Sequence, residues 1–176
     1  MKRAICRLLL ISTLLVTACS GSKVSLEDFS SEAGQFSISV PGAFQETQES
    51  VETPVGPINI HTFTAEAQNS AYVVAYSDYP TEIVEQSDPQ MLLDSSRDGA
   101  LGNLNGTIVS EEAIALDGNP GRSLVIDTVD PTGDEATIKS RIYLVNNRLY
   151  QILVVSPKDQ AQEAKFDAFL ESFTLQ

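Results

Sequence analysis

Cysteine, histidine and tryptophan are scarce in this chain of 176 residues, and their scarcity excludes several classes of protein. The chain has two cysteines, Cys6 and Cys19, both close to its N-terminus. The rest of the chain therefore has no disulfide, no thiolate metal site and no cysteine nucleophile. The one histidine, His61, excludes a histidine-rich metal site, and any Ser-His-Asp triad would have to use His61 itself.

Basic residues are also few, with 11 Lys and Arg against 24 Asp and Glu and a net charge of −13. Three of the basic residues fall in the first 18 positions, where there is no acid, so the remainder carries 8 basic and 24 acidic residues. Binding of nucleic acid needs clustered Lys and Arg that release counterions from the phosphates. We therefore expect no nucleic-acid partner. An anionic lipid surface would be repelled in the same way, so any membrane attachment needs another source.

The N-terminal segment supplies that source. Lys2 and Arg3 precede an apolar run over 8–16, which is typical of a secretory signal and is shorter than the about 20 residues that span a bilayer. The run ends in Val16-Thr17-Ala18-Cys19, which resembles the bacterial lipobox. The resemblance implies cleavage after Ala18 and acylation of Cys19, which would become the first residue of the mature protein. The alternative is an ordinary cleaved signal in which Cys19 is incidental.

The lipobox resemblance divides the chain into three parts. Residues 1–18 are the predicted lipoprotein signal, 19–34 are the lipidated cysteine with a flexible polar tether, and 35–176 are the folded domain. Two or three acyl chains would anchor the protein durably, since each buried methylene contributes about 0.8 kcal/mol. Ser20, in place of Asp, resembles the outer-membrane sorting signal of such lipoproteins.

Turn-forming residues divide the domain into short alternating segments that are typical of antiparallel strands. Two helices are predicted, one over 90–104 after Asp88-Pro89 and one that begins at Ser156-Pro157. A two-residue loop at Asn146-Asn147 would pair Val145 with Arg148 and Tyr143 with Tyr150. The strand over 72–76 is apolar on both faces, which predicts a central position. The predicted strands cover 36–40, 45–51, 58–64, 72–76, 107–116, 122–129, 136–145 and 148–155, with the loop before 122 covering 117–121.

These elements predict an α+β fold, with one antiparallel sheet of about seven or eight strands flanked by helices. The segments 36–44, 141–155 and 166–173 look like the PsbP-like group of domains, which is named for an extrinsic photosystem II protein and includes bacterial lipoproteins. The resemblance implies a PsbP-like sandwich that binds or helps to assemble a membrane protein complex and is not an enzyme. It also implies an extracytoplasmic site, on the periplasmic face of the envelope or in the thylakoid lumen of a cyanobacterium.

The last predicted hairpin carries a group of basic and aromatic residues that could contact a partner or an anion. Lys139 and Arg141 lie beside Tyr143, and Arg148 lies beside Tyr150, all on one predicted face. Guanidinium and phenol groups can bind a carboxylate or an acidic loop of a partner. The alternative is that these cations pair with acidic residues of the same domain and cover apolar surface with their stems.

Metal, cofactor and catalytic sites are not predicted. Asp127, Asp130, Asp134 and Glu135 gather around one turn over 127–135, but their spacing differs from that of an EF-hand and favours a solvated acidic turn. His61 lies in a predicted strand, and no G-x-S-x-G motif presents a serine to it. A small-ligand or cation-binding envelope lipoprotein, or an unrecognised hydrolase, is the alternative function.

Overall fold

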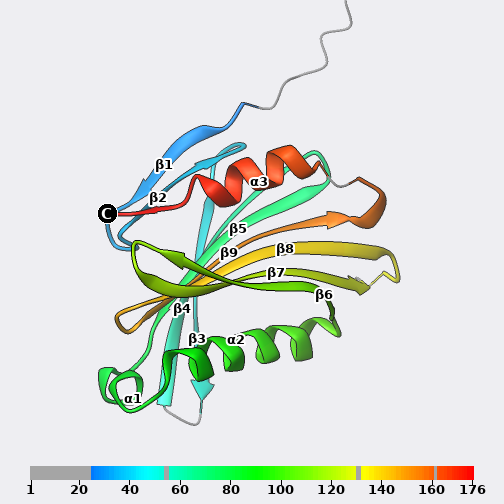
Figure 1. Ribbon diagram of the computed structural model, residues 1–176. Coiled ribbons are helices and arrows are strands. Elements are labelled where there is room, and N and C mark those ends of the chain that lie inside the picture. Colours follow the sequence, from blue (N-terminus) through cyan, green and yellow to red (C-terminus); the bar gives the residue numbers. More distant parts are fainter. Residues whose placement is uncertain (1–24, 54–55, 130–131, 161) are drawn as a thin grey trace, which may run out of the picture.

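The computed structural model describes residues 25–53, 56–129, 132–160 and 162–176. In these residues the chain forms a main sheet of seven strands and a small sheet of three strands (Figure 1). The expected single sheet is therefore corrected to two. The predicted signal segment and Cys19 lie outside the described residues. No helix in the described ranges is long and apolar enough to cross a membrane.

The main sheet consists of two meanders that meet at its centre. Strand β5 lies between β4 and β9, which confirms the predicted interior position of 72–76. The hairpin of β8 and β9 also has the predicted register, with Val145 opposite Arg148 and Tyr143 opposite Tyr150. In spatial order the strands are β3 (Gln45–Thr53), β4 (Gly56–Ala67), β5 (Ser70–Asp78), β9 (Arg148–Pro157), β8 (Glu135–Val145), β7 (Asn119–Val129) and β6 (Thr107–Leu116).

The loop between β6 and β7 is shorter than predicted. Leu116 pairs with Asn119, so only Asp117 and Gly118 form the turn. Both have positive φ values, of 50° and 85°, which is the backbone of the two-residue turn that fits the twist of a hairpin. The rest of the predicted loop therefore belongs to β7.

The small sheet joins the two ends of the described chain. It consists of β1 (Glu27–Ser31), β2 (Phe36–Val40) and β10 (Thr174–Leu175), with β2 in the middle. Two expectations are corrected here. The folded part begins at Glu27 and not at residue 35, because β1 pairs with β2 along its whole length. Strand β2 pairs with β10 and not with the main sheet, because its apolar side chains pack onto the face of that sheet.

The helices are α1 (Thr81–Glu85), α2 (Pro89–Leu104) and α3 (Glu163–Glu171), with a 3-10 turn η1 (Lys158–Gln160). Helix α2 begins and ends as predicted. The carboxylate of Asp88 accepts a hydrogen bond from the Gln90 amide at 2.8 Å, and Asn105 ends the helix in a left-handed conformation. The C-terminal helix starts later than Ser156, because β9 continues its pairing with β8 to Pro157.

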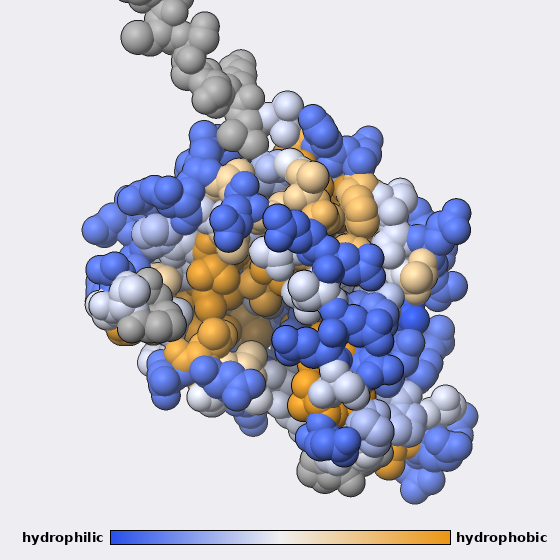
Figure 2. Space-filling model, turned by 180° about the vertical axis from the view of Figure 1, so that it is seen from behind, coloured by the Kyte–Doolittle hydropathy of each residue, from blue (hydrophilic) through white to orange (hydrophobic). Residues whose placement is uncertain are grey.

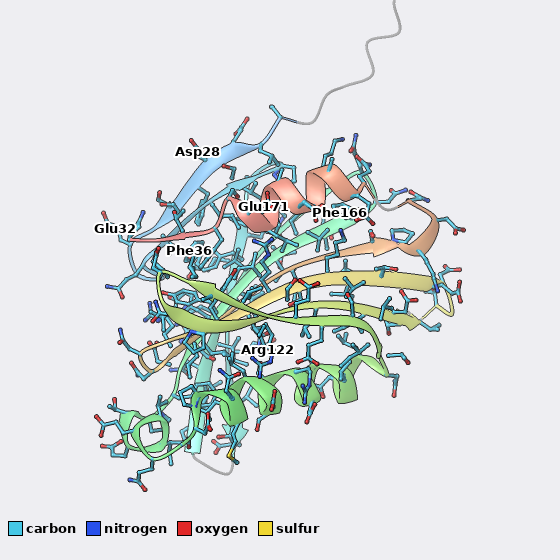
Figure 3. All side chains as sticks on the ribbon, viewed as in Figure 1. Asp28, Glu32, Phe36, Arg122, Phe166 and Glu171 are labelled. Atoms are coloured by element: carbon cyan, nitrogen blue, oxygen red, sulfur yellow. The ribbon has the colours of Figure 1, made fainter. Side chains whose placement is uncertain are left out.

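The main sheet has a layer on each side (Figure 1). The α3 face is the side covered by α3 and the small sheet, and the α2 face is the side on which α2 lies. A row of aromatic rings crosses four neighbouring strands on the α3 face: His61, Tyr76, Tyr150 and Tyr143 are successive partners. Phe173 covers this row, with its ring parallel to that of Tyr143. Figure 3 shows Phe36 and Phe166, which reach the same core from β2 and α3.

Gly121 ends the aromatic row, opposite Tyr143 on β7. A Cβ atom there would lie 2.4 Å from the Ile142 carbonyl oxygen and 2.5 Å from Cδ1 of Tyr143. The absence of a side chain at Gly121 thus makes room for the tyrosine ring.

We predict that Gly121→Ala lowers the free energy of unfolding by about 1 to 3 kcal/mol, because the backbone or the ring must move. The matched control is Gly99→Ala in α2, where an added Cβ meets nothing within 4 Å. This change should leave stability unchanged or raise it by up to about 1 kcal/mol. Urea unfolding followed by circular dichroism measures the stability of both variants. Equal effects of the two changes would contradict the conclusion that Gly121 makes room for the Tyr143 ring.

Candidate functional site

The predicted basic residues of β8 bind acidic residues of α3. The Lys139 Nζ donates hydrogen bonds to Glu163 and, at 3.1 Å, to Asp167. The Arg141 guanidinium lies 3.6 Å from the Glu171 carboxylate. These pairs hold α3 against the sheet. They also neutralise the positive charges of Lys139 and Arg141 that an acidic partner would otherwise bind.

Arg148 connects three separate parts of the fold. It makes two hydrogen bonds to the Asp78 carboxylate, at 2.6 and 2.7 Å, and one of 2.9 Å to the Ala33 carbonyl oxygen. Its guanidinium also lies 4.5 Å from the centre of the Tyr76 ring. The hydrogen bonds from Arg148 hold the pKa of Asp78 below its ordinary value.

The two tyrosines of the predicted group are interior residues. Tyr143 and Tyr150 are 4% and 2% exposed, and the Tyr150 hydroxyl donates to the Gly34 carbonyl oxygen at 2.7 Å. The sequence correctly placed all five residues on one face, but that face is the covered α3 face. Their geometry is that of the alternative, in which the cations pair with acids of the same domain.

His61 packs as an aromatic residue. Its ring is parallel to that of Tyr76 at 4.6 Å, and its Nδ1 atom lies 3.7 Å from the Glu46 carboxylate. Nδ1 is buried and has no hydrogen-bond partner in the described part of the chain. Among the residues that the structure describes, no serine is hydrogen-bonded to this imidazole.

The acidic turn is partly outside the described residues, since Asp130 is among those not described. Asp127 accepts hydrogen bonds from Lys158 and Thr137, both at 2.9 Å. In the ranges that the structure describes, no three acidic, histidine or cysteine residues lie close enough together to hold a metal ion.

The α2 face is covered over only part of its width. Leu93 packs on β8 and on the start of β9, and Leu101 packs on the cluster of Leu124, Ile126 and Ile138. The principal sheet contacts of α2 are to β7 and β8. Figure 3 shows Arg122 in this layer, between β7 and α2.

The remaining part, here called the open sheet face, is formed by the second half of β4, the first half of β5 and the second half of β9, since Ala75 and Ser77 further along β5 are buried. Val73 lies between Thr64 and Leu153, and Ala71 lies opposite Val155. All five side chains are half-buried, whereas Val74 and Val154, which point to the α3 face, are 0% and 1% exposed. Figure 2 shows a recessed apolar area with polar residues around it on the back of the molecule.

The open sheet face continues into a hollow of about 1010 Å³ at the end of the sheet. This hollow lies between the β4–β5 turn, the β7–β8 turn and η1, and its lining includes Glu66, Ala71 and Val155. The apolar face is thus bordered at this end by charged side chains, with the four carboxylates of Glu66, Asp134, Glu135 and Asp159 outnumbering Lys158.

Acidic residues border the face because charge is unevenly distributed along the chain, a pattern that is visible in the sequence. Residues 24–96 contain no Lys or Arg and twelve Asp and Glu, and they supply β3, β4 and β5. Glu49 and Glu66 lie on the α2 side of β3 and β4. Arg97 of α2 and Arg122 of β7 already form ion pairs within the domain. Arg97 lies 2.9 Å from Glu111, and Arg122 lies 3.2 Å from Asp94.

Comparison with known proteins identifies the fold. No protein-family model matches the chain, and a search of curated proteins found no match. Among solved structures, the solution structure of cyanobacterial PsbP (CyanoP) from Synechocystis sp. PCC 6803 matches with a TM-score of 0.56 and 14% identity. The match covers 92% of this chain and 99% of that one.

A second match is the crystal structure of a Pseudomonas aeruginosa protein of unknown function, a putative regulator. Its TM-score is 0.41 at 6% identity, over 77% of this chain and 85% of that one, which is too low to support an argument. The first match confirms the predicted PsbP-like fold. The domain has more sheet and fewer helices than we expected of it.

We predict that Asp78→Asn lowers the free energy of unfolding at pH 7 by about 1 kcal/mol, because Arg148 loses its ionised partner. The folded pKa of Asp78 is depressed, so this contribution is complete above the unfolded value of about 3.9 and is lost as the pH falls through the folded value. The difference from wild type should therefore shrink between pH 5 and pH 3, whereas Glu112→Gln, exposed on β6, should change little at any pH. Urea titrations between pH 3 and pH 5 measure the difference in free energy of unfolding. A difference that does not change with pH would contradict a stabilising role of the ionised Asp78–Arg148 pair.

Proposed function

We propose that this protein is a lipid-anchored, extracytoplasmic and non-enzymatic domain that binds a membrane protein through the open sheet face. The observation that carries the proposal is that Thr64, Ala71 and Val73 on the α2 face are only half-buried, although the strands around them are apolar. An uncovered apolar area with a polar border is typical of a protein interaction site. The lipobox resemblance and the fold shared with CyanoP support the location and the class.

The chemistry of the open sheet face favours protein binding over catalysis. A catalytic site brings several polar or titratable groups to one point in a concave surface. The open sheet face presents the side chains of Val73, Leu153, Val155 and Ala71, with one hydroxyl from Thr64. Such a surface gains free energy by losing water, and it has no group that would activate a substrate.

The position of Cys19 supports a membrane protein as the partner. Eight residue steps separate it from Glu27, where the fold begins, and they can span at most about 28 Å. An acylated Cys19 would therefore keep the domain close to the membrane surface, on the periplasmic side or in the thylakoid lumen.

We predict that Cys19→Ala moves the full-length protein from the membrane fraction to the soluble fraction of a bacterial host, because the acylated residue is lost. Cys6→Ala is the matched control and should stay with the membranes, since residue 6 belongs to the segment that is cleaved. Immunoblotting of washed membranes measures both. Retention of Cys19→Ala on the membranes would contradict the anchor.

We also predict that a photoreactive residue in place of Val73 crosslinks the anchored protein to one discrete integral membrane protein in cells of its source. The same residue in place of Glu27, on β1, should give no such product. Mass spectrometry of the crosslinked band identifies the captured chain. Identical products from both positions, or none from position 73, would contradict the proposed interface.

A further inference from the structure

We infer that the open sheet face binds a cationic amphipathic helix, supplied by the partner and placed beside α2. The inference rests on the proposed function for the existence of a partner, and it adds the chemistry of the segment that docks. It follows from the width of the uncovered area, from its apolar surface and from the charge around it.

The width of the uncovered area suits one helix. Neighbouring strands are about 4.8 Å apart, so β4, β5 and β9 together present a strip about 10 Å wide. The diameter of an α-helix with its side chains is about 10 Å. The strip lies beside the part of the sheet that α2 covers, so a second helix would complete the layer that α2 begins.

The surface of the strip requires an apolar stripe on that helix. Val73 and Leu153 are direct neighbours across β5 and β9, and Val155 lies two residues further along the same face. In the covered half of the layer, α2 presents Leu93 and Leu101 to the sheet. A partner helix with leucines at similar spacing would bury the half-exposed methyl groups in the same way.

The charge around the strip requires Lys or Arg on the outer side of the helix. Glu49 lies on β3 and Glu66 on β4, and both are exposed. The segment 24–96, which supplies β3, β4 and β5, contains no Lys or Arg. Lys and Arg on the partner would pair with these carboxylates, and the open sheet face would therefore prefer a cationic partner.

The same charge disfavours two other occupants. A second copy of this chain would bring the same acidic border and a net charge of −13 against its own. An anionic phospholipid would be repelled by Glu49 and Glu66 in the same way. Both remain distinguishable outcomes of the test below.

The test uses the full-length protein in nanodiscs of zwitterionic lipid and two synthetic peptides of about 18 residues, which is five helical turns. Both peptides carry leucines on one side, and the other side carries lysines in one peptide and glutamates in the other. Methyl NMR follows Val73, Leu153 and Val155 on the open sheet face, with Val74 and Val154 as internal references. We expect the lysine peptide to shift the first three and to bind at least tenfold more tightly than the glutamate peptide, with binding that weakens as salt is added.

Matched variants identify the surface. Glu49→Gln with Glu66→Gln should weaken binding of the lysine peptide by about fivefold, whereas Glu27→Gln with Glu32→Gln, on the other side of the molecule, should not change it. Val73→Thr keeps the branched shape and should weaken binding by about threefold. Met91→Gln, at an exposed position of α2, should leave binding unchanged.

Equal binding of the two peptides, shifts confined to the small sheet, or methyl shifts that depend on protein concentration alone would overturn the inference. Shifts on addition of anionic lipid without peptide would also overturn it. If a photoreactive residue at position 73 captures a membrane protein while the lysine peptide does not bind, the proposed function stands and the helix chemistry is wrong. If neither is observed, both fail.

Discussion

The structure depends on one constraint, which is that the central strands of the main sheet are apolar on both faces and need cover on both. With no disulfide in the described domain, the covering layers must be held by packing. On the α3 face, Phe36, Phe166, Phe169 and Phe173 close the core around the row of tyrosines. On the α2 face, α2 covers β7, β8 and part of β9, while Thr64, Ala71 and Val73 stay half-buried. The fold is therefore complete on one side and incomplete on the other, which is the basis of the proposed interaction.

The ion pairs of the domain are also divided between the α3 face and the α2 face. The cations Lys139, Arg141 and Arg148 attach the layer on the α3 face, and Arg97 and Arg122 hold α2 to β6 and β7. These cations are paired inside the domain, whereas the segment 24–96 has twelve acidic residues and no Lys or Arg. The acidic border of the open sheet face comes from this segment. It gives an apolar surface a preference for one sign of partner charge.

Local signals predicted much of the fold. The turn at Asn146-Asn147 fixed the β8–β9 register, and Asp88 and Asn105 fixed the ends of α2, because each depends on neighbours in sequence. Strand β1 was missed because its sequence shows little alternation and only Phe29 packs into the core. Its place depends on β2, which is itself paired with β10 at the far end of the chain.

The site was predicted less well because it also depends on contacts between residues that are far apart in sequence. The common face of Lys139, Arg141 and Arg148 followed from strand alternation, but their acidic partners lie on α3 and at Asp78, far away in sequence. The open sheet face could not be read from strands that are apolar on both sides, since the extent of α2 over the sheet is a tertiary property. The lack of Lys and Arg over 24–96 was visible, and it would have indicated the acidic border.

Solvent accessibility at neighbouring residues distinguishes the two faces of the main sheet most directly. Methyl NMR of the full-length protein with a soluble paramagnetic probe compares Val73 with Val74, and Val155 with Val154. We predict strong relaxation enhancement for the methyls of Val73 and Val155 and little for those of Val74 and Val154, which are almost fully buried. Equal protection of all four valines would show that the α2 face is covered in solution, and it would contradict the claim that this face is open to a partner.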